Sequence, residues 1–218
     1  MADSTLPDAY VQKFLKSFAL AEINAEVDTI TSGRFGVRSY PTTLLLNVKG
    51  QEIDRMVGYY PPEEFVAGIT NSLAGIGTLE DLIQRAEANP SVEADYEVGQ
   101  KYRYRGDYGQ AAYYFMKVMA TDPSNEKGKS AECAYNLAHM KYKLKDYLGA
   151  VDLWKKMVAS YPKDPMSVDG ELMIAYSYQK AGDVKNAKKE YNDFLKKYPD
   201  TEEKEWIAEQ FTAMDKKK

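Results

Sequence analysis

Apolar residues in the back half of the chain recur with the period of a helix. In each of the segments 92–125, 131–164 and 168–201, two such stretches flank a short polar turn. Spacing at i, i+3, i+4 and i+7 predicts an amphipathic helix, so each segment is expected to form two helices. A further stretch, Glu203 to Met214, places Trp206, Ile207 and Phe211 on one side. We expect this stretch to be a capping helix for the last apolar face.

The three segments carry the same residue types at matching positions. Aligned residues are Gly106, Lys145 and Gly182 in the turn, then Ala111, Ala150 and Ala187, then Phe115, Trp154 and Tyr191, and finally Pro123, Pro162 and Pro199. The alanines allow two helices to approach closely, and the large rings fill the space toward the next pair. Proline lacks an N–H group and ends the second helix. Such self-similarity predicts a stacked array of helix pairs.

This pattern resembles the tetratricopeptide repeat, a family that binds proteins or peptides along a concave face and is not catalytic. The resemblance implies a ligand groove formed by the first helix of each pair. Its residues would be Tyr96, Gln100, Arg103 and Tyr104 in the first repeat, Tyr135, His139, Tyr142 and Lys143 in the second, and Leu172, Tyr176, Gln179 and Lys180 in the third. The alternative is that several of these tyrosines pack between repeats.

The front of the chain has a different pattern. Apolar spacing predicts a helix over 8–18, a strand over 19–27 and a brief helix over 29–35. Two β-branched or apolar runs, 42–48 and 51–59, are separated by a Lys-Gly turn and predict a hairpin. Pro61 and Pro62 followed by two glutamates predict the start of another helix.

This order of elements, with Tyr40-Pro41-Thr42 before the hairpin, resembles the C-terminal portion of a thioredoxin-like domain. The resemblance implies that Pro41 follows a cis peptide bond and that Tyr40, Pro41 and Thr42 form the loop facing that family's active site. The family's Cys-x-x-Cys motif is absent, and Met1 to Leu6 is similar to the helix just downstream of it. Without two cysteines no intramolecular dithiol exchange is possible.

The resemblance also implies that a central strand is missing. Three explanations stay open. The chain begins at an internal Met of a longer thiol-disulfide oxidoreductase; its remaining strands pair directly; or a strand comes from another copy or another protein. The last explanation predicts a homodimer formed by strand exchange.

We therefore expect a partial thioredoxin-like α/β module followed by a three-repeat tetratricopeptide α-solenoid with a capping helix. The predicted boundaries are 1–74 for the module, 75–91 for a linker and capping helix, 92–202 for the repeats, and 203–218 for the final helix and a solvated lysine tail. Thr78 is the expected N-cap of the linker helix.

Composition narrows the function. The net charge of −4 argues against a nucleic-acid surface, which needs a clustered basic face. The single cysteine, Cys133, is expected to be a buried filler, and the single histidine, His139, argues against a His-rich metal site. We expect no cofactor, no metal, no membrane span and no secretory leader. The Tyr-Pro endings of the repeats resemble bacterial envelope proteins, with a cytoplasmic location as the alternative.

The function predicted from these observations is a scaffold or adaptor that binds a protein or peptide and is redox-inactive as given. The rival interpretations are the C-terminal part of a thiol-disulfide oxidoreductase and a strand-exchange dimerisation module.

Overall fold

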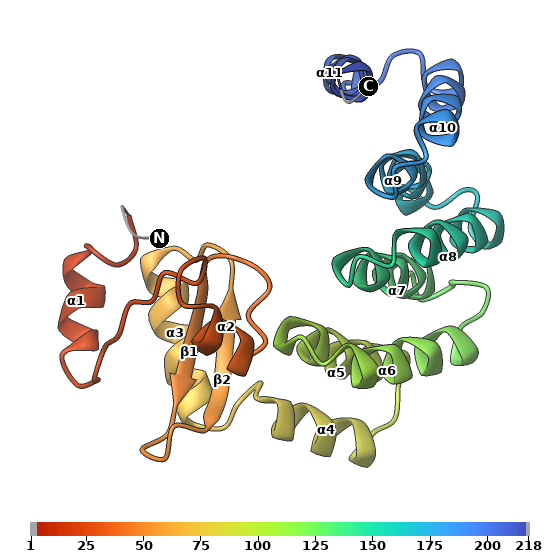
Figure 1. Cartoon of the computed structure of the whole chain (residues 1–218). Coiled ribbons are helices and arrows are strands. Elements are labelled where there is room, and N and C mark those ends of the chain that lie inside the picture. Colours follow the sequence, from red (N-terminus) through yellow and green to blue (C-terminus); the bar gives the residue numbers. More distant parts are fainter. Residues whose placement is uncertain (1–3, 217–218) are drawn as a thin grey trace. The chain divides into compact units, whose positions relative to one another are not determined.

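Two compact units, Met1–Tyr114 and Phe115–Lys218, make up the chain. The computed structural model describes residues 4–216. Its helices and strands are drawn in Figure 1. Met1, Ala2 and Asp3, and Lys217 and Lys218 of the predicted solvated tail, lie outside the described residues.

The first unit begins with the predicted mixture of helices and a hairpin. Its elements are α1 (Ala9–Leu15), α2 (Thr29–Arg34), β1 (Thr42–Leu46), β2 (Glu52–Val57) and α3 (Pro62–Leu73). The two strands are antiparallel, with Thr42 opposite Val57 and Leu44 opposite Arg55, and a register shift follows Leu45. The predicted hairpin and the helix after Pro61 are confirmed.

A small apolar core lies between α1 and α3. Val11 and Leu15 of α1 pack with Phe65, Val66 and Ile69 of α3, and Leu45 and Met56 of the hairpin add to the same cluster. Asp8 caps α1 by accepting hydrogen bonds from the amides of Tyr10 and Val11. The hairpin and the two helices therefore share one apolar core, although the sheet has only two strands among the described residues.

The strand predicted over 19–27 is wrong, because these residues form no β-ladder. Asn24 instead nucleates a turn: its backbone carbonyl accepts from Val27 and Asp28, and its side chain accepts from the amide of Glu26. A side chain that bonds its own neighbouring backbone competes with strand pairing. The helix expected near residues 1–6 is also absent from the described part, since residues 4–7 form turns.

The remainder of the first unit is helical. The helix α4 (Leu79–Ala88) is capped by Thr78, as predicted, and α5 (Val92–Arg105) is capped by Ser91. Leu82 and Ala86 of α4 pack against Val98 of α5. The next helix, α6 (Tyr108–Thr121), contains the division between the two units.

The second unit contains the remaining repeat helices and a last helix. They are α7 (Ser130–Lys143), α8 (Tyr147–Ser160), α9 (Met166–Lys180), α10 (Val184–Lys197) and α11 (Lys204–Asp215). The antiparallel pairs predicted for the second and third repeats, and the capping helix, are confirmed.

The turn inside each pair explains the aligned glycine position. Gly106, Lys145 and Gly182 have φ angles of 76°, 63° and 82°. This left-handed conformation lets the next amide reach back to a carbonyl in the preceding helix, which satisfies one of the carbonyls at the helix end. Glycine adopts it without steric cost, whereas Lys145 adopts it under strain.

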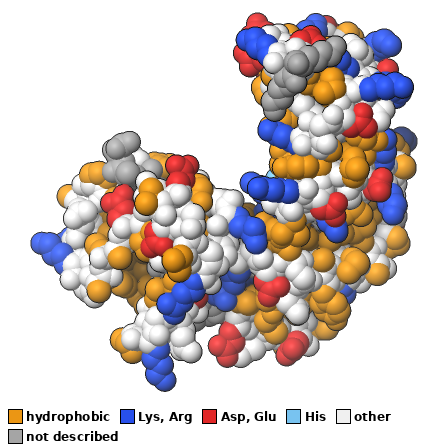
Figure 2. Space-filling view, in the orientation of Figure 1, with side chains coloured by type: hydrophobic (Ala, Val, Ile, Leu, Met, Phe, Trp, Pro, Cys, Tyr) orange, Lys and Arg blue, Asp and Glu red, His pale blue; other side chains and the backbone are white. Residues whose placement is uncertain are grey.

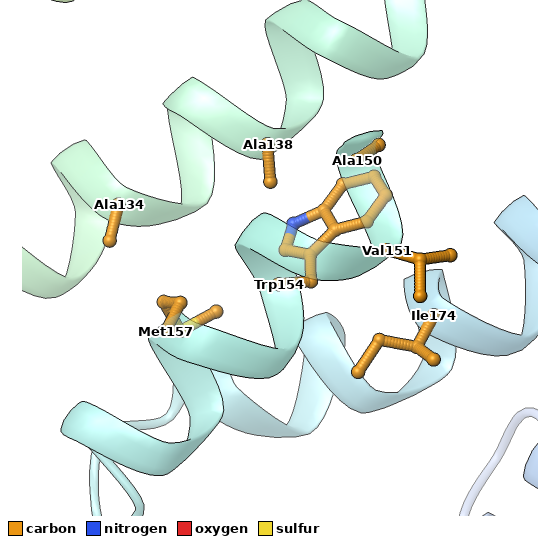
Figure 3. Close-up of a cluster of buried hydrophobic side chains, with 7 residues drawn as sticks. All are labelled: Ala134, Ala138, Ala150, Val151, Trp154, Met157 and Ile174. Carbon is orange, nitrogen blue, oxygen red and sulfur yellow. The ribbon is translucent and has the colours of Figure 1, made fainter. Parts of the chain in front are cut away.

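The aligned alanines and rings are the core of the second unit. Ala150 and Trp154 are 0% exposed, and they pack with Ala134 and Ala138 of α7 and Ile174 of α9. Figure 3 shows the indole of Trp154 between α7 and α9. Ala187 and Tyr191 fill the same places in the third repeat, where Ile207 and Met214 of α11 close the cluster. Within residues 4–216, no helix is both long enough and apolar enough to cross a bilayer.

Candidate functional site

A continuous ladder of aromatic rings runs along one face of the second unit. Ring centroids of Tyr135 and His139 lie 6.3 Å apart, and those of His139 and Tyr142 also lie 6.3 Å apart. Tyr142 stacks on Tyr176 at 5.9 Å, and Tyr176 meets Trp206 edge-on at 5.4 Å. All five rings are half-buried. We call these five residues the aromatic ladder.

The repeat geometry brings the ladder together. Tyr135, His139 and Tyr142 lie at i, i+4 and i+7 on α7, which places them on one helix face. The stacking of α9 beside α7 then brings Tyr176 against Tyr142. The inner edges of Tyr135 and Tyr142 pack on Trp154, at 5.9 and 6.1 Å between centroids. These tyrosines were predicted either to line the groove or to pack between repeats. The structure is compatible with both, because the same rings pack inward and keep part of their surface exposed.

Burial changes the acid–base properties of these tyrosines. It raises the pKa of the Tyr135 hydroxyl, with the Asp169 carboxylate adding to the effect. Burial also raises the pKa of Tyr142, and the neighbouring Tyr176 hydroxyl contributes. Both hydroxyls therefore stay protonated at neutral pH, and that of Tyr142 already shares a hydrogen bond with Tyr176.

Exposed cations border the ladder. The ammonium group of Lys180 lies 4.8 Å from the centroid of the Tyr176 ring, a cation–π contact. Lys143, in the last turn of α7, is also exposed. Figure 2 shows hydrophobic side chains interspersed with Lys and Arg on the visible face of the second unit. A surface of this kind suits a partner that offers apolar side chains together with carboxylates.

Two further residues predicted for the groove, Leu172 and Gln179, are half-buried and contact other parts of the third repeat and α11. Leu172 packs on the core cluster of Ala175, Ala187 and Tyr191. Gln179 accepts a hydrogen bond from the Tyr191 hydroxyl at 2.9 Å, and its amide donates to Gln210 at 3.2 Å. Both side chains therefore hold the third repeat and α11 together.

Trp206 is the ladder residue that the groove prediction omitted. Sequence reasoning placed it on the apolar side of the capping helix, which is correct, because it packs on the third-repeat cluster. Its contact with Tyr176 follows from α11 taking the place that the first helix of another repeat would occupy. The sequence feature that could have placed Trp206 in the ladder is its position as an aromatic residue near the start of a helix that follows three repeats.

The four first-repeat residues predicted for the groove lie together on α5. The Gln100 amide donates to the Tyr96 hydroxyl at 2.6 Å, and Arg103 donates to the Gln100 oxygen at 2.7 Å. The Arg103 guanidinium also lies 4.5 Å from the Tyr104 ring centroid. These contacts link the four side chains into one row along α5.

A pocket of about 320 Å³ opens beside this face, within the first unit. It is lined by Arg55, Val57, Tyr60, Gly77, Leu82, Tyr96, Glu97, Gln100, Lys101 and Tyr104. Burial raises the pKa of the Tyr60 hydroxyl, and the nearby Tyr104, Glu64 and Asp54 add to the shift. The volume lies at the lower end of the range for small-ligand pockets and is sufficient for one large side chain of a partner.

Ion pairs fasten β2 to α5 behind this pocket. The Lys101 ammonium lies 2.6 Å from one Asp54 oxygen, and the Ser72 hydroxyl donates to the other at 2.7 Å. Arg105 lies 3.3 Å from Glu52 and donates to the Ile53 carbonyl at 3.0 Å. Because buried charges need partners, these contacts keep the strand and the helix in register.

Arg55 completes the connection. Its guanidinium donates to Glu52 at 2.8 Å, to the Tyr104 carbonyl at 3.1 Å and to the Phe35 carbonyl at 2.7 Å. The side chain is 2% exposed. The carbonyl of Tyr104 is among those that a helix C-terminus leaves without an intrahelical donor, so Arg55 caps α5.

The thioredoxin-like loop has the predicted backbone. The Tyr40–Pro41 peptide bond is cis, as the resemblance implied. The Thr42 hydroxyl donates to the Ser39 carbonyl at 2.7 Å, and the Gly58 amide donates to the Pro41 carbonyl at 2.8 Å. Tyr40 is 58% exposed. A role for these residues in ligand contact remains a prediction.

The single cysteine is buried. Cys133 is 0% exposed, and burial raises the pKa of its thiol from 9.0 to about 12. Thiol reactivity requires the thiolate, so Cys133 is unreactive at neutral pH in the folded protein. The structure confirms the prediction of a small buried filler.

Two family models match separate parts of the chain. Residues 11–71 match the family described as thioredoxin-like domain. Residues 127–208 match YfiO, the family described as outer membrane lipoprotein. No curated protein gives a significant match. The chain thus joins a thioredoxin-like segment to helical repeats of the tetratricopeptide type.

Proposed function

We propose that this chain is a protein-interaction module, and that the aromatic ladder of the second unit is its main binding surface. The observation that carries the proposal is the ladder itself: five half-buried rings in mutual contact across α7, α9 and α11. Tyrosine and tryptophan anchors are frequent hot spots of protein interfaces because they bury much area at low entropic cost.

The border of the ladder favours one ligand chemistry. Exposed Lys180 contacts the Tyr176 ring, exposed Lys143 lies in the last turn of α7, and the Tyr135 hydroxyl remains a protonated donor. A peptide segment that carries apolar or aromatic side chains and carboxylates would both pack on the rings and pair with the lysines. The first-unit pocket beside Tyr96 and Tyr104 is a separate place that would accept one large side chain of a partner.

The module is proposed to act without redox chemistry. Dithiol exchange needs two cysteines, and the chain has only Cys133. The thioredoxin-like segment therefore contributes structure: its hairpin forms part of the pocket wall and is fastened to α5 through Asp54 and Lys101.

Peptide selection followed by affinity measurement tests the proposal. Peptides would be selected on the intact protein from a displayed random library and measured by fluorescence anisotropy. The Lys143→Glu/Lys180→Glu variant reverses two exposed charges, and we expect it to weaken binding of acidic peptides at least about tenfold. Tyr176→Ala should have a similar effect, since it removes the middle of the ladder.

The matched control reverses two exposed lysines on the second helices of the repeats. Lys156→Glu/Lys185→Glu makes the same change in net charge on α8 and α10. We expect this variant to bind like the wild type, apart from a small nonspecific charge effect. Equal affinity of selected peptides for the wild type, the Lys143/Lys180 variant and Tyr176→Ala would refute the ladder as the binding surface.

A further inference from the structure

Charges of opposite sign lie at the two ends of the aromatic ladder. Asp169 is in the first turn of α9 and Lys180 in its last turn, with Tyr176 between them. These positions are i, i+7 and i+11, so the three side chains share one face of the helix. On α7, Glu132 and Lys143 hold the matching places in the first and last turns. The face that carries the ladder is therefore acidic where α7 and α9 begin and basic where they end.

The register of α7 against α9 places Asp169 beside Tyr135. Tyr142 stacks on Tyr176, with 5.9 Å between the ring centroids. Tyr135 lies seven residues before Tyr142, and Asp169 lies seven residues before Tyr176. Because α7 and α9 run in the same direction, both steps cover about 10 Å at ~1.5 Å per residue. Burial is the main cause of the raised pKa of the Tyr135 hydroxyl, and the Asp169 carboxylate adds to it, as expected for neighbours.

Three of these charged side chains are available to a ligand. Asp169, Lys143 and Lys180 are exposed, and among residues 4–216 none of them takes part in an ion pair. The helix dipole also favours acids at helix starts and lysines at helix ends, so the charges alone do not indicate a site. Their position at the ends of a row of half-buried rings does, because aromatic rings and charges together select a partner of complementary charge.

The spacing of the charges sets the length of the ligand. Asp169 and Lys180 are about 16 Å apart along α9, at ~1.5 Å per residue. An extended chain advances about 3.3 Å per residue, so about five residues cover this distance. The ladder rings lie between the two ends and offer apolar surface to the side chains in the middle of such a segment.

We propose, on the basis of the proposed binding surface, that the ladder face binds an extended peptide segment with opposite charges about five residues apart. A basic side chain of the ligand lies against the Tyr135 ring and pairs with Asp169. An acidic side chain pairs with Lys180, and apolar or aromatic side chains between the two charges pack on the rings. The partner is therefore of mixed charge, with its basic and acidic groups at separate ends of the bound segment.

Charge exchange between protein and ligand tests this pairing. Peptides selected on the intact wild-type protein should carry a basic and an acidic residue about five positions apart. Asp169→Lys should weaken their binding at least about tenfold, measured by fluorescence anisotropy. Replacing the basic residue of the peptide by glutamate should restore affinity for this variant to within about threefold of the original. Such compensation requires direct contact, because damage to the fold would weaken binding of both peptides.

Two further variants control for charge and shape. Asp169→Asn removes the charge with little change of shape and should weaken binding of the selected peptides by about threefold or more. Asp152→Lys makes the same charge reversal as Asp169→Lys at an exposed position on the second helix of the repeat, α8. We expect it to bind the selected peptides like the wild type.

The outcomes separate this inference from the proposed function. Loss of binding in Tyr176→Ala together with unchanged affinity in Asp169→Lys would overturn the charge pairing and leave the ladder as the binding surface. Selected peptides that lack a basic residue would also overturn the pairing alone. Unchanged affinity in Tyr176→Ala would overturn both proposals.

Discussion

The buried indole of Trp154 offers a quantitative test of the packing described above. Trp154 is 0% exposed, and within residues 4–216 its Nε1–H group has no hydrogen-bond acceptor. Replacing a buried aromatic residue by alanine costs about 3–5 kcal/mol of unfolding free energy. We expect Trp154→Ala to fall in this range, because the indole fills the space between α7, α8 and α9.

Trp154→Phe should cost far less, and the difference can be worked out. The substitution removes two buried carbons, about 1.6 kcal/mol at ~0.8 kcal/mol each, and the small cavity left behind adds about 0.5–1 kcal/mol. It also removes an unsatisfied buried donor, whose presence costs about 1–3 kcal/mol. The opposing effects nearly cancel, so we expect a net loss of about 1 kcal/mol or less.

Urea unfolding followed by far-ultraviolet circular dichroism measures both variants without relying on tryptophan fluorescence. The midpoints should rank as wild type, then Trp154→Phe close to it, then Trp154→Ala far below. Because the chain has two compact units, unfolding can proceed in two steps, and the shift belongs to the step of the second unit. A loss for Trp154→Phe approaching that of Trp154→Ala would refute the argument from the unsatisfied N–H.

Three further predictions concern the backbone, the thiol and alkaline pH. Gly36→Ala should lower the melting temperature, because Gly36 has φ +59° and an added Cβ would lie 2.8 Å from the Arg105 carbonyl oxygen. The control Gly33→Ala should raise the melting temperature slightly, because Gly33 lies on α2 and an added Cβ would meet no atom within 4 Å. Cys133 should resist alkylation at pH 8 in the native protein and react only on unfolding; rapid native labelling would contradict its burial and its raised pKa. Burial raises the pKa of Tyr142 and Tyr191, so unfolding releases their protons once the pH exceeds the ordinary value of 10.0. Stability should therefore be fully kept below that pH and be lost as the pH rises above it, and an unfolding free energy that is flat from pH 9 to 11 would oppose this reasoning.

The candidate site was predictable where local spacing determines it. The three positions on α7 follow from the helical period, and their contact with α9 follows from the stacking that repeats impose. Leu172 and Gln179 occupy positions on the same predicted face but contribute to packing. Distinguishing exposure from packing at such positions requires the neighbouring helix α11, which comes later in the chain.

The sequence by itself determined the elements whose partners are close in the chain: the paired helices with the short turns between them, the hairpin and the capped start of α4. Helical hydrogen bonds join residues four apart, so periodicity and capping residues are enough to predict them. The tertiary structure decided what depends on distant partners. Residues 19–27 have the pattern of a strand but no ladder to join, and the first-unit pocket exists because Asp54 and Arg55 meet α5 about fifty residues later. Pairing of this kind depends on which surfaces remain available after the local elements have formed, and local patterns do not contain that information.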